Sequence, residues 1–274
     1  MRSPYATAGI PSAQQRASRD ALWQRASVAS ALAVSAFSLI IIGLNEAANI
    51  EPLLLEVLAA LQAIGGGAYE IIFVDDGSSD DSIAQLVRLR EHIPFLRIFR
   101  HAEPLGQSAA IRTGVLAARH PIVVTMDGDG QNDPAEIARL LAPFSEAGSR
   151  VALVAGQRLG RQDSLSKRVA SRVANHLRQS VLNDGARDTG CGLKAFRRDA
   201  YLALPYFDHM HRYLIALMRQ QEQEVRFVDV VDRPRRAGRS KYGNIDRLLV
   251  GIPDLFGVWW LQHRQRGRAA VDEL

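Results

Sequence analysis

The feature that most constrains the fold is a regular alternation between short apolar runs and amphipathic segments. The apolar runs occupy residues 38–42, 71–74, 96–99, 122–126 and 151–155, and a further strand is expected at 225–231. Short unbroken runs of this kind are typical of parallel strands that are buried on both faces. Strands that alternate with helices indicate a mostly parallel central sheet with right-handed crossovers. The chain is therefore expected to adopt an α/β fold with helices on both faces of the sheet.

Amphipathic segments fill the intervals between these runs. One begins after Asn49, continues through Leu53 and Leu61, and ends at the glycines of residues 65–67. Others are expected through Leu86 and Leu89, over residues 109–118 and after residue 134. Their apolar residues recur at the spacing of one helix face, which predicts helices that pack against the sheet.

Composition excludes several classes of protein. With 47% hydrophobic and 23% charged residues, the chain is able to bury a substantial core and is not expected to be disordered. Cys191 is the single cysteine, so neither an internal disulfide nor a cysteine-based zinc site is available. The net charge of +5 suggests an anionic partner. Nucleic acid is excluded as that partner, because the chain has no recognisable reading helix or aromatic stacking surface.

The amino-terminal region requires a separate interpretation. Residues 26–44 are apolar enough to resemble a signal peptide or a weak membrane span. Their first part is only mildly hydrophobic, however, and Leu39 to Ile42 are better used as a buried strand. No other stretch reaches the roughly 18–20 apolar residues that a spanning helix needs. We therefore expect residues 1–36 to form a flexible tail and residues 37–245 to form the main domain.

Acidic residues follow two of the expected strands. Asp75 and Asp76 come directly after one strand, and Asp127 and Asp129 follow another. Ligands of open parallel sheets bind beyond the carboxyl ends of the strands, where these side chains would lie. Asp127 and Asp129 share one side of an extended segment. With the neutral oxygen of Gln131, they suit Mg²⁺ or Mn²⁺, which complete their ligand shell with water and substrate phosphates. A solvated turn and a helix cap after residue 77 are the alternative interpretations.

Taken together, six short motifs resemble the inverting family 2 glycosyltransferases of the GT-A fold. Within them, the chain is most similar to the dolichol-phosphate mannose synthase and bacterial polyprenyl-phosphate glycosyltransferase group, over about residues 37 to 262. The motifs are Asn45-Glu46, Asp75-Asp76-Gly77-Ser78, residues 106–110 with Gly114, residues 127–131, residues 188–192 with Arg197-Arg198, and Arg235 with residues 238–242. Six motifs in one order are far more specific than any one of them.

The resemblance implies a role for each matching position. The residues that it implies for donor binding are Asn45, Glu46, Asp75, Asp76, Ser78, Gly106, Gln107 and Asp127. Asp75 and Asp76 would hold the nucleoside, while Asp127, Asp129 and Gln131 would hold the divalent cation and the donor diphosphate. Asp129 and Asp188 are implied as catalytic. The residues expected on the acceptor or phosphate side, partly from their position after the fifth strand, are the basic Arg158, Lys167, Arg168, Arg172, Arg235 and Lys241, together with Ser240.

The expected reaction is inverting transfer of a sugar from a UDP- or GDP-sugar to a polyprenyl phosphate. A phosphate monoester has a second pKa of about 6, so it is mostly ionised near neutral pH and needs positive charge more than a strong base. Ile42, Leu44, Pro104 and Asp232 depart from the family pattern. Two alternatives therefore stay open: transfer to a saccharide hydroxyl, with Asp188 or Asp232 as the base, and a catalytically weakened donor-binding regulator.

The carboxyl-terminal segment, residues 246–274, bears on location. Residues 248–261 are apolar, too short to span a bilayer, and interrupted by Pro253 and Asp254. Trp259 and Trp260 precede a basic tail, which suits a membrane interface with anionic headgroups. We expect a cytoplasmic protein attached peripherally to the inner face of the membrane. A helix packed on the domain or in a homo-oligomer contact is the alternative.

Overall fold

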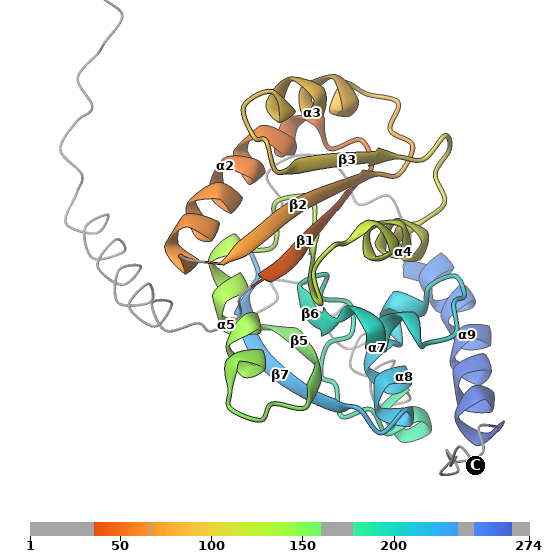
Figure 1. Cartoon of the computed structure of the whole chain (residues 1–274). Helices are drawn as coiled ribbons and strands as arrows, with labels where there is room; N and C mark the ends of the chain where they lie inside the picture. The colour runs from red at the N-terminus through yellow and green to blue at the C-terminus, as the bar shows by residue number, and fades with distance from the viewer. Residues whose placement is uncertain (1–35, 66, 160–177, 235–243, 265–274) are drawn as a thin grey trace, which may run out of the picture.

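The computed structural model describes residues 36–65, 67–159, 178–234 and 244–264. A seven-stranded sheet with the order β3-β2-β1-β4-β6-β5-β7 forms the centre of this part of the chain (Figure 1). The strands are β1 (Ala36–Gly43), β2 (Ala68–Asp75), β3 (Leu96–Arg100), β4 (Ile122–Asp127), β5 (Val151–Leu159), β6 (Lys194–Arg197) and β7 (Glu224–Val231). All six strands expected from the apolar runs are present.

Helices cover both faces of the sheet. They are α2 (Ala47–Ile64), α3 (Ser82–Arg90), α4 (Gln107–Ala117), α5 (Ile137–Leu141), α7 (Arg198–Leu202), α8 (Leu214–Gln220) and α9 (Asn244–Arg264), with short 3₁₀ turns at Pro134–Glu136, Ala142–Ser145 and Met210–Arg212. Leu39 and Ile41 of β1 point into a core shared with α2, α3 and α5. Ile40, between them, points into a second core shared with α4, α7, α8 and α9. The strand alternation therefore builds a three-layer sandwich.

The register of the parallel strands places the acidic motifs at one edge of the sheet. Gly43 at the end of β1 pairs with Asp75 of β2, and the preceding residue, Ile42, pairs with Asp127 of β4. Both carboxylates therefore flank the end of the same central strand. This arrangement confirms the expectation that the two acidic clusters share the carboxyl edge.

One strand was not expected from the sequence. β6 runs antiparallel between β4 and β5, and it separates them in the sheet. Its four residues include Lys194 and Arg197 at the two ends, so it lacks the unbroken apolar run by which the other strands are recognised. β6 carries the segment after Asp188 directly alongside β4.

A buried ion pair joins three strands at the opposite edge. Glu70 of β2 accepts hydrogen bonds from Ser38 Oγ (2.7 Å), the Arg119 backbone N–H (2.7 Å) and Arg97 Nη1 (2.7 Å). Burial raises the pKa of the Glu70 carboxyl, but these hydrogen bonds and the Arg97 charge outweigh it and hold the pKa below the usual value. The charge is tolerated because both carboxylate oxygens have donors.

Pro253 and Asp254, which interrupt the apolar run in the sequence, lie inside the single helix α9. Leu255 and Val258 pack into the core next to α8, and Gln220 Nε2 donates to the Leu261 carbonyl (2.8 Å). Within the described residues, α2 is the helix whose length and hydropathy would suit a membrane span. Its apolar face packs against the sheet instead, as a core helix does.

Candidate active site

Asp75 is the buried acid at the end of β2. Its Oδ2 accepts a hydrogen bond from the Ser78 backbone N–H (3.0 Å) and lies 3.8 Å from Arg100 Nε. Oδ1 is fully buried and has no hydrogen-bond partner among the described residues. An unpaired buried carboxylate oxygen costs free energy in a folded protein, and Oδ1 is able to accept a hydrogen bond from a water molecule or a ligand.

Asp76 has a different environment. It accepts hydrogen bonds from the backbone N–H groups of Leu105 (2.9 Å) and Gly106 (2.8 Å) and contacts His101 Nδ1 (2.7 Å). Asp76 therefore fixes the loop that leads into α4. The fixed loop places Gln107, the first residue of α4, next to the end of β4. The expected contact of Asp76 with a nucleoside stays a prediction.

The Asn45-Glu46 motif ties the end of β1 to the loop after β2. Asn45 adopts a left-handed conformation, with φ of 54°, and its Oδ1 accepts hydrogen bonds from the backbone N–H groups of Ser79 (2.7 Å) and Asp80 (3.3 Å). Its own N–H donates to Ser78 Oγ (2.7 Å), while Glu46 accepts from Asn49 Nδ2 (2.6 Å). These contacts hold the loop around Asp75 in place, and a direct donor contact by these residues stays a prediction.

Asp127 and Asp129 lie at the end of β4. Asp127 Oδ1 accepts a hydrogen bond from Gln107 Nε2 (2.8 Å), so α4 orients this carboxylate. Asp129 is buried, and its Oδ1 accepts from the Gln131 backbone N–H (3.0 Å). The side chain of Gln131 donates to the Arg233 carbonyl (3.3 Å). The predicted metal residues thus lie in one turn, and the side chain of Gln131 joins that turn to the segment after β7.

Two glycines allow this turn to sit close to its neighbours. A Cβ on Gly128 would lie 2.8 Å from the Ile42 carbonyl oxygen, so only glycine lets the turn lie against the end of β1. A Cβ on Gly192 would overlap the carboxylate of Asp127. The segment before β6 therefore packs directly against the predicted metal-binding carboxylate.

The residues present fit a divalent cation. Within the described parts of the chain, no group of three His, Cys, Asp or Glu side chains is positioned to hold a metal. Mg²⁺ and Mn²⁺ at phosphate-transfer sites do not need such a group, because one or two carboxylates hold them together with water and substrate phosphates. Asp127 and Asp129 offer that minimal set, with Gln107 and Gly192 fixing the position of Asp127.

Lys194, at the start of β6, supplies a positive charge behind the acidic turn. It is 5% exposed, and its Nζ donates to the carbonyl oxygens of Cys191 and, at 3.4 Å, Thr189. Burial lowers the pKa of this ammonium, and the charges of Asp127 and Asp188 oppose the shift. The sequence motif before Lys194 pointed to this region, but Lys194 itself was not identified from the sequence.

Arg158 and Asp188 form a partly buried ion pair beside the site. Arg158 Nε and Nη2 contact the two oxygens of Asp188 at 2.6 and 3.1 Å, and Arg158 Nη1 lies 4.0 Å from Asp232 Oδ2. Burial lowers the pKa of Arg158, but the hydrogen bonds and charge of Asp188 outweigh it and raise the pKa. Asp232, one of the departures from the family pattern, thus faces the same guanidinium as Asp188.

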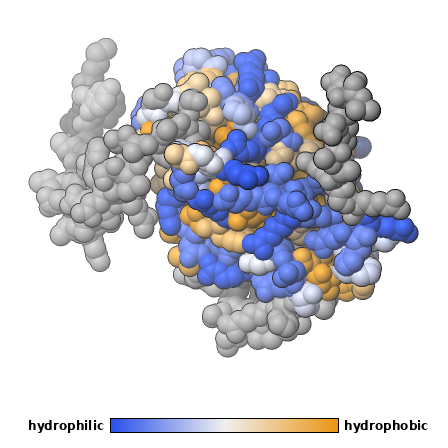
Figure 2. All heavy atoms as spheres, turned by 60° about the horizontal axis from the view of Figure 1, so that its bottom comes forward, coloured by the Kyte–Doolittle hydropathy of each residue, from blue (hydrophilic) through white to orange (hydrophobic). Residues whose placement is uncertain are grey.

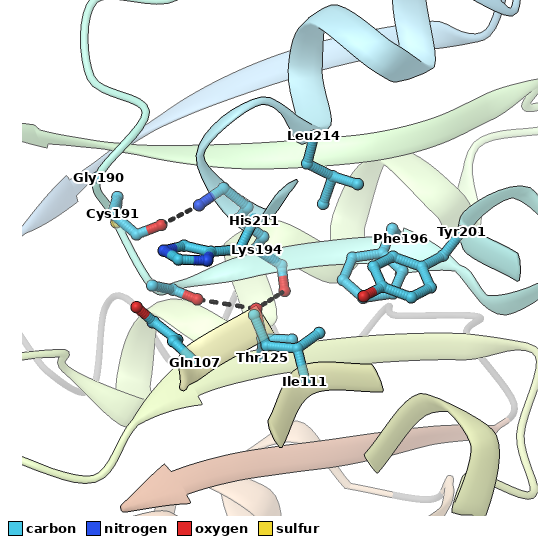
Figure 3. A pocket seen from close by; sticks show the side chains of 11 residues that line it. Gln107, Ile111, Thr125, Gly190, Cys191, Lys194, Phe196, Tyr201, His211 and Leu214 are labelled. Carbon is cyan, nitrogen blue, oxygen red and sulfur yellow. Dashed lines mark hydrogen bonds between the residues drawn. The ribbon is translucent and has the colours of Figure 1, made fainter. Parts of the chain in front are cut away.

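A small cavity adjoins these residues (Figure 3). Gln107, Gly192, Lys194 and His211 are among the residues that line it, and Thr125 Oγ1 donates to the Gly192 carbonyl (2.8 Å) in its wall. His211 carried no recognisable signal in the sequence, since it is brought here by long-range packing. The predicted residues Lys167, Arg168, Arg172, Arg235, Ser240 and Lys241 lie outside the described residues.

The sheet order, the helices on both faces and the acidic turn after β4 define a glycosyltransferase of the GT-A fold. A model of the family described as "Glycosyl transferase family 2" matches residues 38–204. The chain belongs to this family. The fold and the family expected from the sequence motifs are both confirmed.

Two relatives whose names state an activity are more than 30% identical to this chain. The dodecaprenyl-phosphate galacturonate synthase of Rhizobium johnstonii is 32% identical over 84% of this chain and 68% of its own length. The undecaprenyl-phosphate 4-deoxy-4-formamido-L-arabinose transferase of Sodalis glossinidius is 34% identical over 75% of this chain and 62% of its own length. The chain thus spans about two thirds of the length of these relatives.

Solved structures support the fold. The glucosyl-3-phosphoglycerate synthase of Mycobacterium tuberculosis, in complex with Mn²⁺, UDP and glucosyl-3-phosphoglycerate, superimposes with a TM-score of 0.64. It is 20% identical, and the match covers 93% of this chain and 86% of that protein. At this identity the likeness concerns the fold alone.

Proposed function

We propose that this protein is an inverting, metal-dependent glycosyltransferase that moves a sugar from a nucleotide-sugar donor to a polyprenyl phosphate. Two relatives above 30% identity carry names that describe transfer to polyprenyl phosphates. The acidic turn after β4 and the unpaired Asp75 oxygen support a nucleotide-diphosphate donor, since they provide a cation site and an acceptor for donor N–H or hydroxyl groups.

The observation that carries the choice of acceptor is the ion pair between Arg158 and Asp188. Transfer to a sugar hydroxyl needs a base, for which Asp188 and Asp232 are the candidates on this side of the site. Both face Arg158, and Asp188 accepts two hydrogen bonds from it. A neighbouring guanidinium favours the ionised carboxylate and weakens it as a proton acceptor. A phosphate acceptor needs no such base, which favours the polyprenyl phosphate.

Within this proposal, each group has a defined task. A bound Mg²⁺ or Mn²⁺ would neutralise the charge that develops on the departing nucleoside diphosphate. Asp127 and Asp129 would hold the cation, and the hydrogen bond from Gln107 fixes the position of Asp127. Asp75 binds the nucleoside through its buried oxygen, while Asp76 fixes the loop between β3 and α4. Asp188 positions Arg158 on the acceptor side of the site.

The test is nucleotide release from a panel of UDP- and GDP-sugars with Mg²⁺ or Mn²⁺, with and without a polyprenyl phosphate. Asp129→Asn removes a carboxylate from the site and is expected to lower turnover at least about a hundredfold. Asp81→Asn removes an exposed carboxylate near α3 and serves as the matched control. Turnover that needs the cation, the lipid phosphate and Asp129 supports the proposal. Absence of donor binding in the wild type refutes it, and turnover onto a saccharide hydroxyl alone selects the rival acceptor.

We also propose that α9 attaches the protein to the cytoplasmic face of the membrane. Its outer stripe exposes Ile252, Phe256, Trp259 and Trp260, with Phe256 62% exposed. The stripe recurs every three to four residues opposite the buried Leu255, so one face of the helix packs on the domain and the other stays apolar. Hydrophobic patches also interrupt the otherwise hydrophilic face shown in Figure 2. Aromatic side chains beside Arg264 suit a headgroup interface.

Vesicle sedimentation tests this attachment. Phe256→Ser should reduce binding to vesicles that contain anionic lipid, while Leu55→Ser removes a comparably exposed leucine from α2 and should leave binding unchanged. Equal binding of both variants would refute a role for α9. A concentration-dependent dimer that Phe256→Ser dissociates, without vesicle binding, would assign the stripe to a homo-oligomer contact instead.

A further inference from the structure

The cavity between α4 and β6 contains a histidine that no motif explains. His211 lies in the 3₁₀ turn Met210–Arg212, and its ring lines the cavity together with Gln107 and Cys191 (Figure 3). The cavity has a volume of about 10 Å³, which is room for about one water-sized group. It adjoins the hydrogen bond between Gln107 and Asp127.

The hydrogen bonds of His211 define its tautomer. Its backbone N–H donates to Ser108 Oγ (3.2 Å), and its Nδ1 lies 2.8 Å from the same oxygen. The Ser108 hydroxyl already accepts from that N–H, and no other acceptor for its proton is found among the described residues. The arrangement that satisfies both groups has Ser108 donating to Nδ1, which leaves the ring proton on Nε2.

The electrostatic surroundings keep this ring uncharged. Burial lowers the pKa of His211 well below its ordinary value, and the positive charges of Lys194 and Arg212 act in the same direction. Near neutral pH, His211 is therefore a neutral donor at Nε2. A neutral donor is suited to an uncharged oxygen such as a hydroxyl, whereas phosphate oxygens are typically bound by cations and helix termini.

The order of the strands indicates which part of a nucleotide-sugar donor would lie next to His211. Asp75 lies at the end of β2, Asp127 at the end of β4, and Lys194 at the start of β6, in the sheet order β2-β1-β4-β6. A nucleotide sugar has its base, diphosphate and sugar in the same linear order. A donor whose base binds at Asp75 and whose diphosphate binds at Asp127 therefore extends its sugar towards the cavity beside β6.

We infer that His211 is a specificity-determining residue, whose Nε2–H donates to one hydroxyl of the transferred sugar as that hydroxyl enters the cavity. The inference rests on the proposed function, because it requires a nucleotide-sugar donor. The size of the cavity admits a single hydroxyl and excludes the sugar ring. Ser108 acts as a positioning residue, since it fixes the tautomer without contacting the sugar.

The test compares the donor selected by the nucleotide-release panel with each of its monodeoxy analogues. Wild-type enzyme should lose about tenfold or more in kcat/KM with one analogue, because the missing hydroxyl leaves Nε2–H unpaired. His211→Phe should lose a similar factor with the parent donor and no longer distinguish it from that analogue. His211→Gln, which can present an amide N–H, should restore part of the discrimination, and Ser108→Ala should weaken it.

UDP or GDP affinity serves as the control and should match the wild type in Ser108→Ala and His211→Gln, and thermal melting checks that both variants are folded at the assay temperature. Discrimination among the analogues that is the same in wild type and all three variants would overturn the inference while leaving the proposed function intact. A wild-type enzyme that uses no nucleotide sugar in the panel would overturn the proposed function, and this inference with it.

Discussion

Replacing Gly192 by alanine should disable the site through a single steric contact. The new Cβ would overlap Cγ, Oδ1 and Oδ2 of Asp127, whereas ordinary contacts begin near 3.4 Å. The segment around Gly192 cannot easily retreat, because its carbonyl accepts from Thr125 Oγ1 (2.8 Å) and the Leu193 carbonyl accepts from the Gly156 N–H (3.0 Å). Asp127 must therefore move, and its hydrogen bond with Gln107 is lost.

The size of the effect follows from the displacement. The Asp127 carboxylate has to shift by about 1 Å, and misplacement of this size costs roughly a hundredfold in rate. That factor corresponds to about 2.7 kcal/mol of transition-state stabilisation. Overpacking should also lower the free energy of unfolding by roughly 1–3 kcal/mol. Nucleotide release at varied Mn²⁺ or Mg²⁺ concentration measures the first effect, and urea unfolding measures the second.

Gly190→Ala is the matched control on the same segment. Its Cβ would lie 3.2 Å from Arg158 Nη2 and 3.5 Å from Asp188 Oδ1, which are the ends of flexible side chains. Activity should therefore fall much less than in Gly192→Ala, because these side chains need to shift by only a few tenths of an ångström. If Gly192→Ala retained wild-type activity and the wild-type dependence on the cation, the placement of Asp127 against Gly192 would be wrong as the basis of the metal site.

Three further substitutions test the surrounding framework. Glu70→Gln should lower the free energy of unfolding by about 1–3 kcal/mol at pH 7. The folded-state pKa of Glu70 lies below the ordinary 4.5, so the stability that its ionised form contributes is present above pH 4.5 and disappears as the pH falls through the folded-state pKa. Urea unfolding at pH 7 and at lower pH should therefore show that the difference in unfolding free energy between wild type and variant becomes smaller as the pH falls. Asp76→Asn should raise the KM for the donor severalfold, as the Gly106 N–H loses a charged acceptor; an unchanged KM would show that Asp76 does not position the loop before α4. Arg158→Met should destabilise the protein by about 1–3 kcal/mol by removing the cation that donates to both oxygens of Asp188, and Arg158→Lys should cost less; equal melting temperatures would contradict the ion pair.

Apolar patterning was sufficient to predict much of the fold. Runs such as Ile71–Val74 identify buried parallel strands without reference to any partner, because burial on both faces requires apolar residues throughout. The acidic motifs after β2 and β4 were recognisable for a related reason, since parallel strands bring their carboxyl ends to one edge. The family assignment then followed from the order of the motifs.

What only the tertiary structure decided depends on pairing between distant segments. β6 is too short and too polar at its ends to be recognised locally, yet its place between β4 and β5 brings Gly192 against Asp127. The partners of Arg158 could not be predicted either, because the sequence does not show whether an arginine binds a phosphate or a carboxylate. His211 lies over a hundred residues from Ser108 in the chain, and long-range packing alone brings the two side chains into hydrogen-bond contact. Sequence pattern thus determined the strands and the chemistry at their ends, while long-range packing determined which side chains meet there.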